Sequence, residues 1–455
     1  MKHFGLFSLF FGFWLLAGCT ADPGAESGPP GENPPATENP HAVPVEQALE
    51  ELQSVLKEID IPAEDGAVTR SGGVRRVKNV TTVSPEALSP GGTRSEATAN
   101  VEELLYIVNF ENEAGYAILG ADDRLEPVYA VVDEGSLTTE DFRYAVTVTP
   151  EQAEADGELV FPLQMVAQAA LGGIGTGGTG GGGNGIGGGP ITDIGHLGPT
   201  GGPTLIGTEL GPWTNEEYVP NMLKTKWGQS NPYNIRVPNG TDPTGCTPVA
   251  IAQLLTYNKF YYNRAPDVIS SATIQWDLIK QAVQTPSLLK ATPYNDPTIS
   301  VAWLIRLIGR AAGTDYGASG SSTKRYKAVN LMEQWYRNVY REDVSETYVR
   351  RMIFERRLPA IIMGRDTNGD GHSWVADGWL YRTRIVYSVY NDGSKKKYMT
   401  QGQRLVHCNF GWEGSHDGYY YVGAFNTAKS PVTLGVSSTG PDDFSNDNEI
   451  MMYML

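Results

Sequence analysis

The stretch TGCTPVAIAQLLTYN, residues 244–258, decides the fold of this chain. Pro248 suits the first turn of a helix, because its missing N–H would have no partner there, and Thr247 can cap that helix. Nearly every residue from Val249 to Leu255 is apolar, which predicts a helix buried almost all round. Cys246 then lies at the helix N-terminus, where free N–H groups and the helix dipole favour a thiolate. Since most free cysteines are small buried hydrophobic residues, this stretch alone leaves both interpretations open.

The composition narrows the class of protein. With 455 residues the chain has room for two or three domains. Its 35 Lys and Arg against 52 Asp and Glu give a net charge of −17, which argues against nucleic acid as a partner. Three cysteines are too few for a disulfide scaffold, and no Cys/His spacing indicates zinc. We therefore expect no cofactor.

The first residues indicate export. An apolar run from Phe4 to Leu16 follows Lys2 and is too short to span a membrane as a mature helix. It ends in Leu-Ala-Gly-Cys at 16–19, which resembles a bacterial lipobox and so implies a signal peptide at 1–18 and lipidation of Cys19. Plain secretion with cleavage nearby is the alternative. We expect a lipoprotein at the outer membrane or cell surface, with the mature domain open to release and its periplasmic or outward orientation left open.

Composition also divides the remaining chain into a tether, two folded parts and a linker. Residues 19–43 are rich in Pro, Gly, Glu and Ser and predict a flexible tether. The glycine-dominated segment 172–204 predicts a flexible linker and processing region. Between them, 44–171 predicts a small α+β domain, with an amphipathic helix at 44–60 and an antiparallel meander. Its further elements are expected at Leu104–Phe110, Gly115–Gly120, Pro127–Val132 and, as a helix, Phe161–Leu171.

The second part, 205–455, predicts an α+β domain, because helical patterns precede β-rich ones. Asn391-Asp392-Gly393 is a strong hairpin-turn sequence between two of the expected strands. Helices are expected at 216–226, 247–259, 298–312, 324–339 and 345–357. Strands are expected at Pro359–Gly364, Ser373–Leu380, Thr383–Tyr390, Tyr398–Asn409 and Gly418–Val422.

One histidine stands out as a partner for the cysteine. A thiolate hydrolase needs a base near the sulfur, a group that orients the base and donors for the oxyanion. The other five histidines lie in the signal, the tether, the linker, beside Cys408 and in a turn. His372 opens a predicted strand 126 residues after Cys246. Alone it is most simply a polar surface residue, but a cysteine on a helix N-terminus followed by a histidine on a later strand is the papain-like layout.

Five separated motifs resemble the streptopain family of papain-like cysteine peptidases, which are secreted as zymogens. The resemblance implies Cys246 as nucleophile, His372 as base, Asn409 as the group that orients the imidazole, and Gln229 as a side-chain donor to the oxyanion. The motifs are WGQSNPYN at 227–234, Gly245-Cys246 with the helix after it, DYGASGS at 315–321, GHSWVADG at 371–378, and NFGWEG at 409–414 with DGYY at 417–420.

Two residues depart from the family pattern. Phe410 stands where the family has Trp, and it can still shield a hydrogen bond between the imidazole and its orienting amide from water. Glu413 stands where the family has Gly, and an acid there can bias the charge of the substrate.

The first domain resembles the family's propeptide. The matching segments are VNF at 108–110, GYAIL at 115–119, ADDR at 121–124 and VDEG at 132–135. The resemblance implies an inhibitory pro-domain that is removed by a cut near the linker. A non-inhibitory spacer or chaperone domain is the alternative.

Two further patterns carry other interpretations. Asp366, Asn368, Asp370 and Asp377 fit the spacing of a twelve-residue calcium loop, but no helix is predicted on either side, and a polar turn explains them as well. No metal is therefore assigned, and Asp377 is expected to support the strand or a cleft wall. Cys408 is expected in the core rather than in a bridge that would silence the nucleophile.

The sequence thus predicts an exported cysteine endopeptidase, made as a self-inhibited precursor, with a papain-like α+β domain after a small α+β pro-domain. It would act on protein or peptide substrates through a Cys-His thiolate and an acyl-enzyme, with its own pro-domain as intramolecular inhibitor. Papain-like amidases and acyltransferases use the same pair, and a non-catalytic surface binding or adhesion protein can share the fold. Substrate, P2 preference, activation site and oligomeric state stay open.

Overall fold

A computed structural model describes most of both predicted folded parts. The described residues are 39, 41–60, 75–88, 103–148, 157–175, 203–365, 371–425 and 448–455. The predicted signal peptide with Cys19, most of the tether and linker, and the calcium-loop candidates Asp366, Asn368 and Asp370 lie outside them. Among the residues described, no helix is long and apolar enough to cross a membrane.

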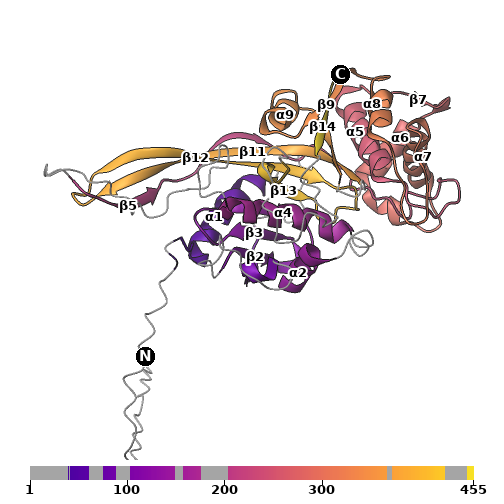
Figure 1. The fold of residues 1–455 in the computed structure, drawn as a ribbon. Coiled ribbons are helices and arrows are strands. Elements are labelled where there is room, and N and C mark those ends of the chain that lie inside the picture. The colour runs from indigo at the N-terminus through magenta and orange to yellow at the C-terminus, as the bar shows by residue number, and fades with distance from the viewer. Residues whose placement is uncertain are drawn as a thin grey trace, which may run out of the picture. The chain divides into compact units, whose positions relative to one another are not determined.

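An antiparallel twelve-stranded sheet organises the fold (Figure 1). Its strands are β1 (Val77–Val83), β2 (Leu105–Phe110), β3 (Tyr116–Gly120), β4 (Val128–Val132), β5 (Leu205–Leu210), β6 (Thr214–Val219), β9 (Arg337–Asp343), β10 (Ala360–Arg365), β11 (Gly371–Tyr390), β12 (Lys395–Asn409), β13 (Gly418–Tyr421) and β14 (Glu449–Met454). The order is β1-β2-β3-β4-β13-β12-β11-β10-β14-β9, and β5 and β6 both pair with β11. A separate small hairpin joins β7 (Val268–Ile269) and β8 (Ala272–Thr273).

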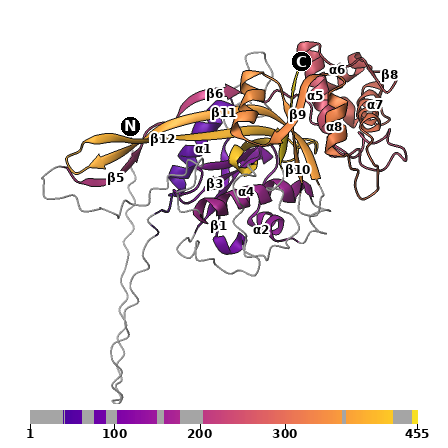
Figure 2. The same cartoon turned by 45° about the horizontal axis from the view of Figure 1, so that its top comes forward.

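Most of the helices pack in two groups. They are α1 (Val45–Ile59), α2 (Thr139–Thr147), α4 (Gly157–Gly175), α5 (Cys246–Tyr262), α6 (Trp276–Gln284), α7 (Asp296–Ala311), α8 (Arg325–Met332) and α9 (Glu346–Arg350), which continues as a π-helical turn, Arg351–Glu355. Short 3₁₀ turns span Pro85–Leu88, Glu111–Glu113, Pro286–Lys290 and Val422–Phe425. The helices α5 to α8 gather at one end of the sheet, whereas α1, α2 and α4 lie with β1 to β4 (Figures 1 and 2).

The pairing of β4 with β13 joins the N-terminal strands to the C-terminal ones in one sheet. Gly418 lies opposite Val132 at the start of this pairing. A Cβ on Gly418 would stand 2.4 Å from the carbonyl oxygen of Val131, so only glycine allows this approach. The residues before the glycine-rich segment therefore extend the sheet that carries His372, while the predicted domain boundaries stay a prediction.

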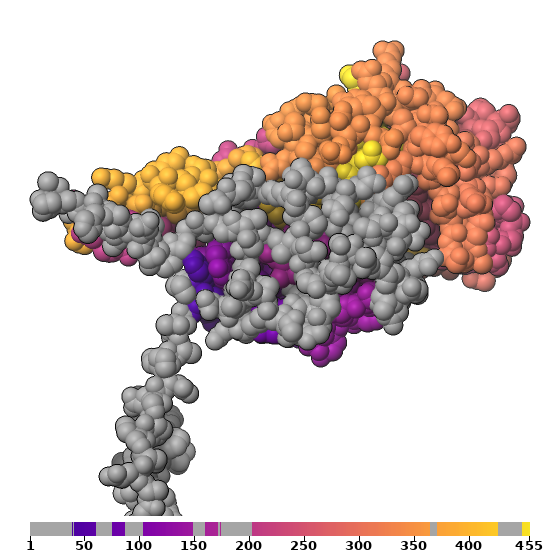
Figure 3. Space-filling model, viewed as in Figure 1, coloured from indigo at the N-terminus to yellow at the C-terminus, as the bar shows by residue number. Residues whose placement is uncertain are grey.

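A long hairpin formed by β11 and β12 extends past β10 and β13, and β5 pairs with β11 at its far end (Figure 1). Its turn contains Gly393 at φ 80°, as the Asn-Asp-Gly sequence predicts. Figure 3 shows the outer surface of this hairpin in yellow-orange. The strands expected separately at Ser373–Leu380 and Thr383–Tyr390 are one strand, β11, because β12 pairs with it almost without interruption.

Several predicted elements are confirmed and others are wrong. The helix at 44–60, the three-strand meander, the helix at 298–312 and the mixed helix-and-sheet fold class are confirmed. The helix expected at 216–226 is wrong: β6 occupies its first residues, because they find hydrogen-bonding partners on β11. The helix expected at 324–339 ends at Met332, and β9 begins at Arg337. The helix α4 also continues to Gly175, inside the segment predicted as linker.

Candidate active site

Cys246 is the first residue of the buried helix α5. Gly245 precedes it at φ 86°, and a Cβ there would stand 3.1 Å from the carbonyl oxygen of Ser321. The Ser321 hydroxyl donates a 2.6 Å hydrogen bond to the Pro243 carbonyl, so the loop at 315–321 supports the turn before the cysteine. Because this turn needs a left-handed residue in a confined place, glycine is required before Cys246.

The helix start differs from the expected one by a residue. Thr247 lies inside α5 and does not cap it; its hydroxyl lies 2.9 Å from that of Ser373 on β11. The Sγ of Cys246 lies 4.0 Å from the carbonyl oxygen of Gly371. The residues on either side of His372 thus contact Cys246 or its neighbour, and the structure brings these two predicted site residues to one place.

His372 is enclosed by aromatic rings. Its Nε2–H donates a 2.9 Å hydrogen bond to the carbonyl oxygen of Phe410. The indole of Trp412 stacks on the imidazole at 4.4 Å between centroids, and Trp374 and Phe410 lie within 6.3 Å. Burial lowers the pKa of His372 to about 4, against the opposing effect of the Phe410 carbonyl.

The aromatic enclosure is completed by Phe161, which comes from α4, before the glycine-rich segment. Its ring meets the imidazole of His372 edge-on, at 5.6 Å between centroids. It makes similar edge contacts with Trp374, Phe410 and Trp412 at 5.1 to 6.5 Å. The ring of Phe161 therefore belongs to the N-terminal part of the chain and lies directly on the predicted base.

The thiol is also held in its neutral form. Cys246 keeps some exposed surface, but most of its surroundings are protein, and this burial raises the pKa of its thiol. Hydrogen bonds from Ser373 and Thr247 act in the opposite direction. With a raised thiol pKa and a lowered imidazole pKa, both groups are neutral near pH 7. A thiolate–imidazolium pair is disfavoured in this arrangement.

Asn409 is fixed by neighbours other than His372. Its Nδ2–H donates 2.8 Å to the Thr225 carbonyl, and its Oδ1 accepts a 2.8 Å hydrogen bond from Nε2 of Gln253. Gln253 in turn accepts from the backbone N–H of Trp227 at 3.2 Å. The imidazole of His372 is hydrogen-bonded instead to the carbonyl of Phe410, the residue after Asn409. The role of Asn409 in orienting the imidazole therefore stays a prediction, which requires the imidazole to move from its present partner.

Gln229 is tied to the same turn as the cysteine. Its carbonyl accepts a 2.9 Å hydrogen bond from the N–H of Thr244, two residues before Cys246. The side chain is partly exposed. Glu413, the acid that departs from the family pattern, lies over Gly228: a Cβ on that glycine would stand 2.6 Å from its Cγ. The oxyanion role of Gln229 stays a prediction, and the Glu413 side chain lies beside the residue that precedes it.

Three contributors to this site were missed by sequence reasoning. Gln253 carries a signal that could have found it, since it is the amide within an apolar helical run and must find a partner when buried. The carbonyl of Phe410 and the ring of Phe161 have no such signal. Their roles depend on long-range packing that spacing along the chain does not encode.

Other candidates lie apart from this site. Both carboxylate oxygens of Asp377 are engaged, one 2.6 Å from Nδ1 of His407 and the other accepting from the N–H of Leu223 at 2.8 Å. Asp377 therefore supports strands β11 and β12, and the other three calcium candidates lie outside the described residues. Cys408 is a free, fully buried thiol in the core, as predicted.

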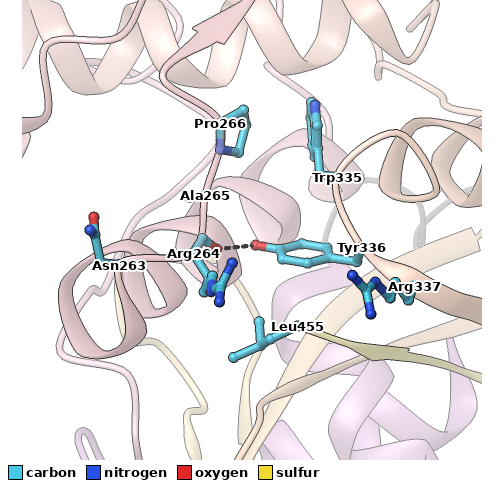
Figure 4. A pocket seen from close by; sticks show the side chains of 8 residues that line it. All are labelled: Asn263, Arg264, Ala265, Pro266, Trp335, Tyr336, Arg337 and Leu455. Carbon is cyan, nitrogen blue, oxygen red and sulfur yellow. Dashed lines mark hydrogen bonds between the residues drawn. The ribbon is translucent and has the colours of Figure 1, made fainter.

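A cavity of about 480 Å³ lies where α5 ends (Figure 4). It is lined by Arg264, Trp335, Tyr336, Arg337 and Leu455, among others, and Tyr336 donates a 2.9 Å hydrogen bond to the Arg264 carbonyl. Its lining contains none of the predicted site residues.

Comparison with known proteins relates part of the chain to one family. A family model of the peptidase C10 family matches residues 227–420, a range that contains Cys246, His372, Asn409 and Gln229. No curated protein matches the chain. One similar solved structure is a fragment of Prevotella intermedia prointerpain A in which a cysteine is replaced by alanine, with 16% identity over 82% of this chain and 98% of that chain, and a TM-score of 0.46. Another is the active wild-type Prevotella intermedia interpain A cysteine protease, with 21% identity over 51% of this chain and 94% of that chain, and a TM-score of 0.34.

The family model confirms, for the residues that it matches, the family inferred from the five motifs. Residues 227–420 match the peptidase C10, or streptopain, family, a family of cysteine-type peptidases.

Proposed function

We propose that this chain is the precursor of an exported cysteine endopeptidase whose N-terminal part, residues 44–171, holds the active site inactive. The observation that carries the proposal is the contact of Phe161 with His372. An aromatic ring from before the glycine-rich segment excludes water from the base and keeps it neutral. A cut within 172–204 would let α4 leave, and the imidazole would regain water and an ordinary pKa.

In the released enzyme, His372 takes the proton of Cys246, and the resulting thiolate is stabilised by the N-terminal end of α5. Because Nε2–H is the donor to the Phe410 carbonyl, Nδ1 of His372 is the nitrogen that takes this proton. Asn409 would orient the ring by replacing that carbonyl as the acceptor. The sulfur attacks the scissile carbonyl and forms a C–S bond. The oxyanion is stabilised by the Gln229 side chain and the backbone N–H of Cys246.

Collapse of this intermediate breaks the C–N bond, and the imidazolium of His372 donates its proton to the leaving amine. Water, deprotonated by the same imidazole, then hydrolyses the thioester and regenerates the thiol of Cys246. Each group used here lies in the matched domain, so the mechanism needs nothing from the N-terminal part.

Self-processing tests this function. The chain from residue 20 onward is incubated with a reducing agent as wild type, as Cys246→Ala and as Cys408→Ala, and the products are followed by gel and mass spectrometry. Wild type and Cys408→Ala are expected to yield a C-terminal fragment that begins within 172–204, whereas Cys246→Ala stays intact. Equal shortening of Cys246→Ala would place the cleavage elsewhere and contradict the proposal.

We propose further that Cys19 carries the lipid that anchors the precursor at the outer membrane or cell surface. The lipobox-like ending of the apolar N-terminal run supports this assignment. Cells fed a labelled fatty acid are expected to label the wild-type chain but not Cys19→Ser. Labelling of both chains to the same extent would contradict the anchor.

A further inference from the structure

A second site of convergent polar groups lies on the long hairpin, well away from Cys246. Arg382 and Arg384 project from the same face of β11, and both guanidinium groups lie over the ring of Trp213, at 4.2 and 4.4 Å. Both arginines are buried, although they carry charge. Since β11 rises about 3.3 Å per residue, Arg382 lies roughly 30 Å along the strand from His372.

Residues after the glycine-rich segment hold these arginines in place. Gln403 on β12 lies directly opposite Arg382, and its Oε1 accepts a 2.8 Å hydrogen bond from the guanidinium Nε. Gln401 lies across from Arg384 and accepts from its Nε at 2.6 Å. Nη2 of Arg382 also donates to Gln403, at 2.5 Å, so residues after the glycine-rich segment orient both guanidinium groups, although Nη1 of Arg382 additionally donates to Ser54 on α1.

The group that occupies this site is a carboxylate from the N-terminal part. Glu51 on α1 accepts hydrogen bonds from Nη1 of Arg384 and from the indole N–H of Trp213. Its second oxygen lies 3.8 Å from Nη2 of Arg382. Two cations and one indole N–H thus surround a single carboxylate, and Glu51 is itself buried by them.

The other acids that act on Arg382 also precede the glycine-rich segment. Burial lowers the pKa of Arg382 to about 9, and the carboxylates that oppose this are Glu51, Glu126 and Glu58. Removal of residues 44–171 would therefore take away Glu51, with which both arginines pair, together with Glu126 and Glu58. A cationic, preformed carboxylate site would then be open on a protein whose net charge is −17.

We propose that Trp213, Arg382 and Arg384 form a carboxylate-binding exosite of the processed peptidase, which receives an acidic side chain of a protein substrate and which Glu51 blocks in the precursor. This proposal rests on the proposed function, since it requires that the N-terminal part is removed. It makes the hairpin a substrate-docking element and the N-terminal part an inhibitor at two places, the base and the exosite.

The first test measures carboxylate binding without any need for catalysis. In the full-length Cys246→Ala chain, Glu51→Ala empties the site, and acetate is small enough to replace the lost carboxylate. Acetate, compared with chloride at equal ionic strength, is expected to raise the Tm of Glu51→Ala, but not of the parent chain or of Glu51→Ala combined with Arg384→Gln. No rise specific to Glu51→Ala would overturn the proposal.

The second test measures substrate choice in the processed enzyme. A protein substrate with an acidic segment beyond its cleavage site is compared with the same protein in which the acids are changed to amides. Wild type is expected to cleave the acidic form about tenfold faster in kcat/KM, as one charge-assisted hydrogen-bonded contact provides, with the preference falling at high salt. Arg384→Gln and Trp213→Phe are expected to lose most of it.

A short neutral peptide and Arg404→Gln serve as controls. Arg404 lies on the same hairpin but pairs with Glu346, which follows the glycine-rich segment. Cleavage of the short peptide is expected to be unchanged in all these variants; if no variant cleaves it, the proposed function fails while the acetate test still stands. Acetate rescue without any preference for the acidic substrate would overturn the exosite and leave only a contact that holds the N-terminal part.

Discussion

Replacement of Phe161 by alanine is expected to release the predicted base. The ring is 2% exposed and packs edge-on against the imidazole of His372 and three other rings. A buried Phe→Ala change costs about 3–5 kcal/mol. If about 3 kcal/mol of this is lost from the docking of α4, the opened form becomes roughly 100-fold more populated. The pKa of His372 should then rise from about 4 toward 6.5 as water replaces the ring.

Two assays follow this change. In the Cys246→Ala background, where no processing occurs, the imidazole of His372 is titrated by NMR. In chains that keep the cysteine, the rate at which a dilute alkylating agent modifies Cys246 is measured against pH. Phe161→Ala is expected to raise both the pKa and the alkylation rate, the rate by one to two orders of magnitude near pH 6 on the same free-energy scale.

Phe142→Ala is the matched control. Phe142 is fully buried on α2 in the same N-terminal part and makes no ring contact with His372 among the described residues. Its loss should destabilise the N-terminal part by a similar amount but leave the pKa of His372 low in the folded precursor. Equal titration curves for the two variants would refute the idea that the ring of Phe161 controls the base.

Three further predictions concern the supports of the site. Gln253→Leu leaves Asn409 and the backbone N–H of Trp227 without their partner, so urea unfolding should show a free energy of unfolding lower by about 1–3 kcal/mol. The kcat/KM should fall as well, and an unchanged kcat/KM would contradict this role. Gly245→Ala should keep the fold but lower peptidase activity at least about tenfold, because φ 86° and the confined Cβ displace the cysteine; full activity would contradict the required glycine. Although burial opposes it, the carboxylates of Asp377 and Asp133 raise the pKa of His407 to about 10. The stability that these carboxylates contribute is therefore complete below pH 6.5 and is lost as the pH rises toward 10. The Tm should fall over this pH range, and Asp133→Asn should flatten the fall.

The parts of this account that were predictable from sequence are those in which local pattern and long-range structure agree. The buried helix after Gly245 and the Asn-Asp-Gly hairpin have local signals strong enough to survive folding. The helix expected at 216–226 failed because its first residues pair with β11, and such pairing leaves little trace in a polar segment. Pairing with a distant strand therefore determined that these residues form β6 rather than a helix.

The same distinction applies to the site. Cys246 and His372 were found because each lies in a short motif at an element's end. The hydrogen bond from His372 to the Phe410 carbonyl was not predictable, since a main-chain acceptor has no residue type to mark it. Nor was the contact with Phe161, because it joins residues more than 200 positions apart through the docking of α4.

The central claim is that Cys246 is the nucleophile and His372 its base, and active-site labelling tests it most directly. The processed enzyme is treated with a peptide that carries a thiol-reactive vinyl sulfone, and the modified residue is located by peptide mapping. We predict modification of Cys246 alone, strongly slowed in His372→Ala and coincident with loss of peptidase activity. Loss of activity with the label on Cys408, or equal labelling of Cys246 in His372→Ala, would contradict the account.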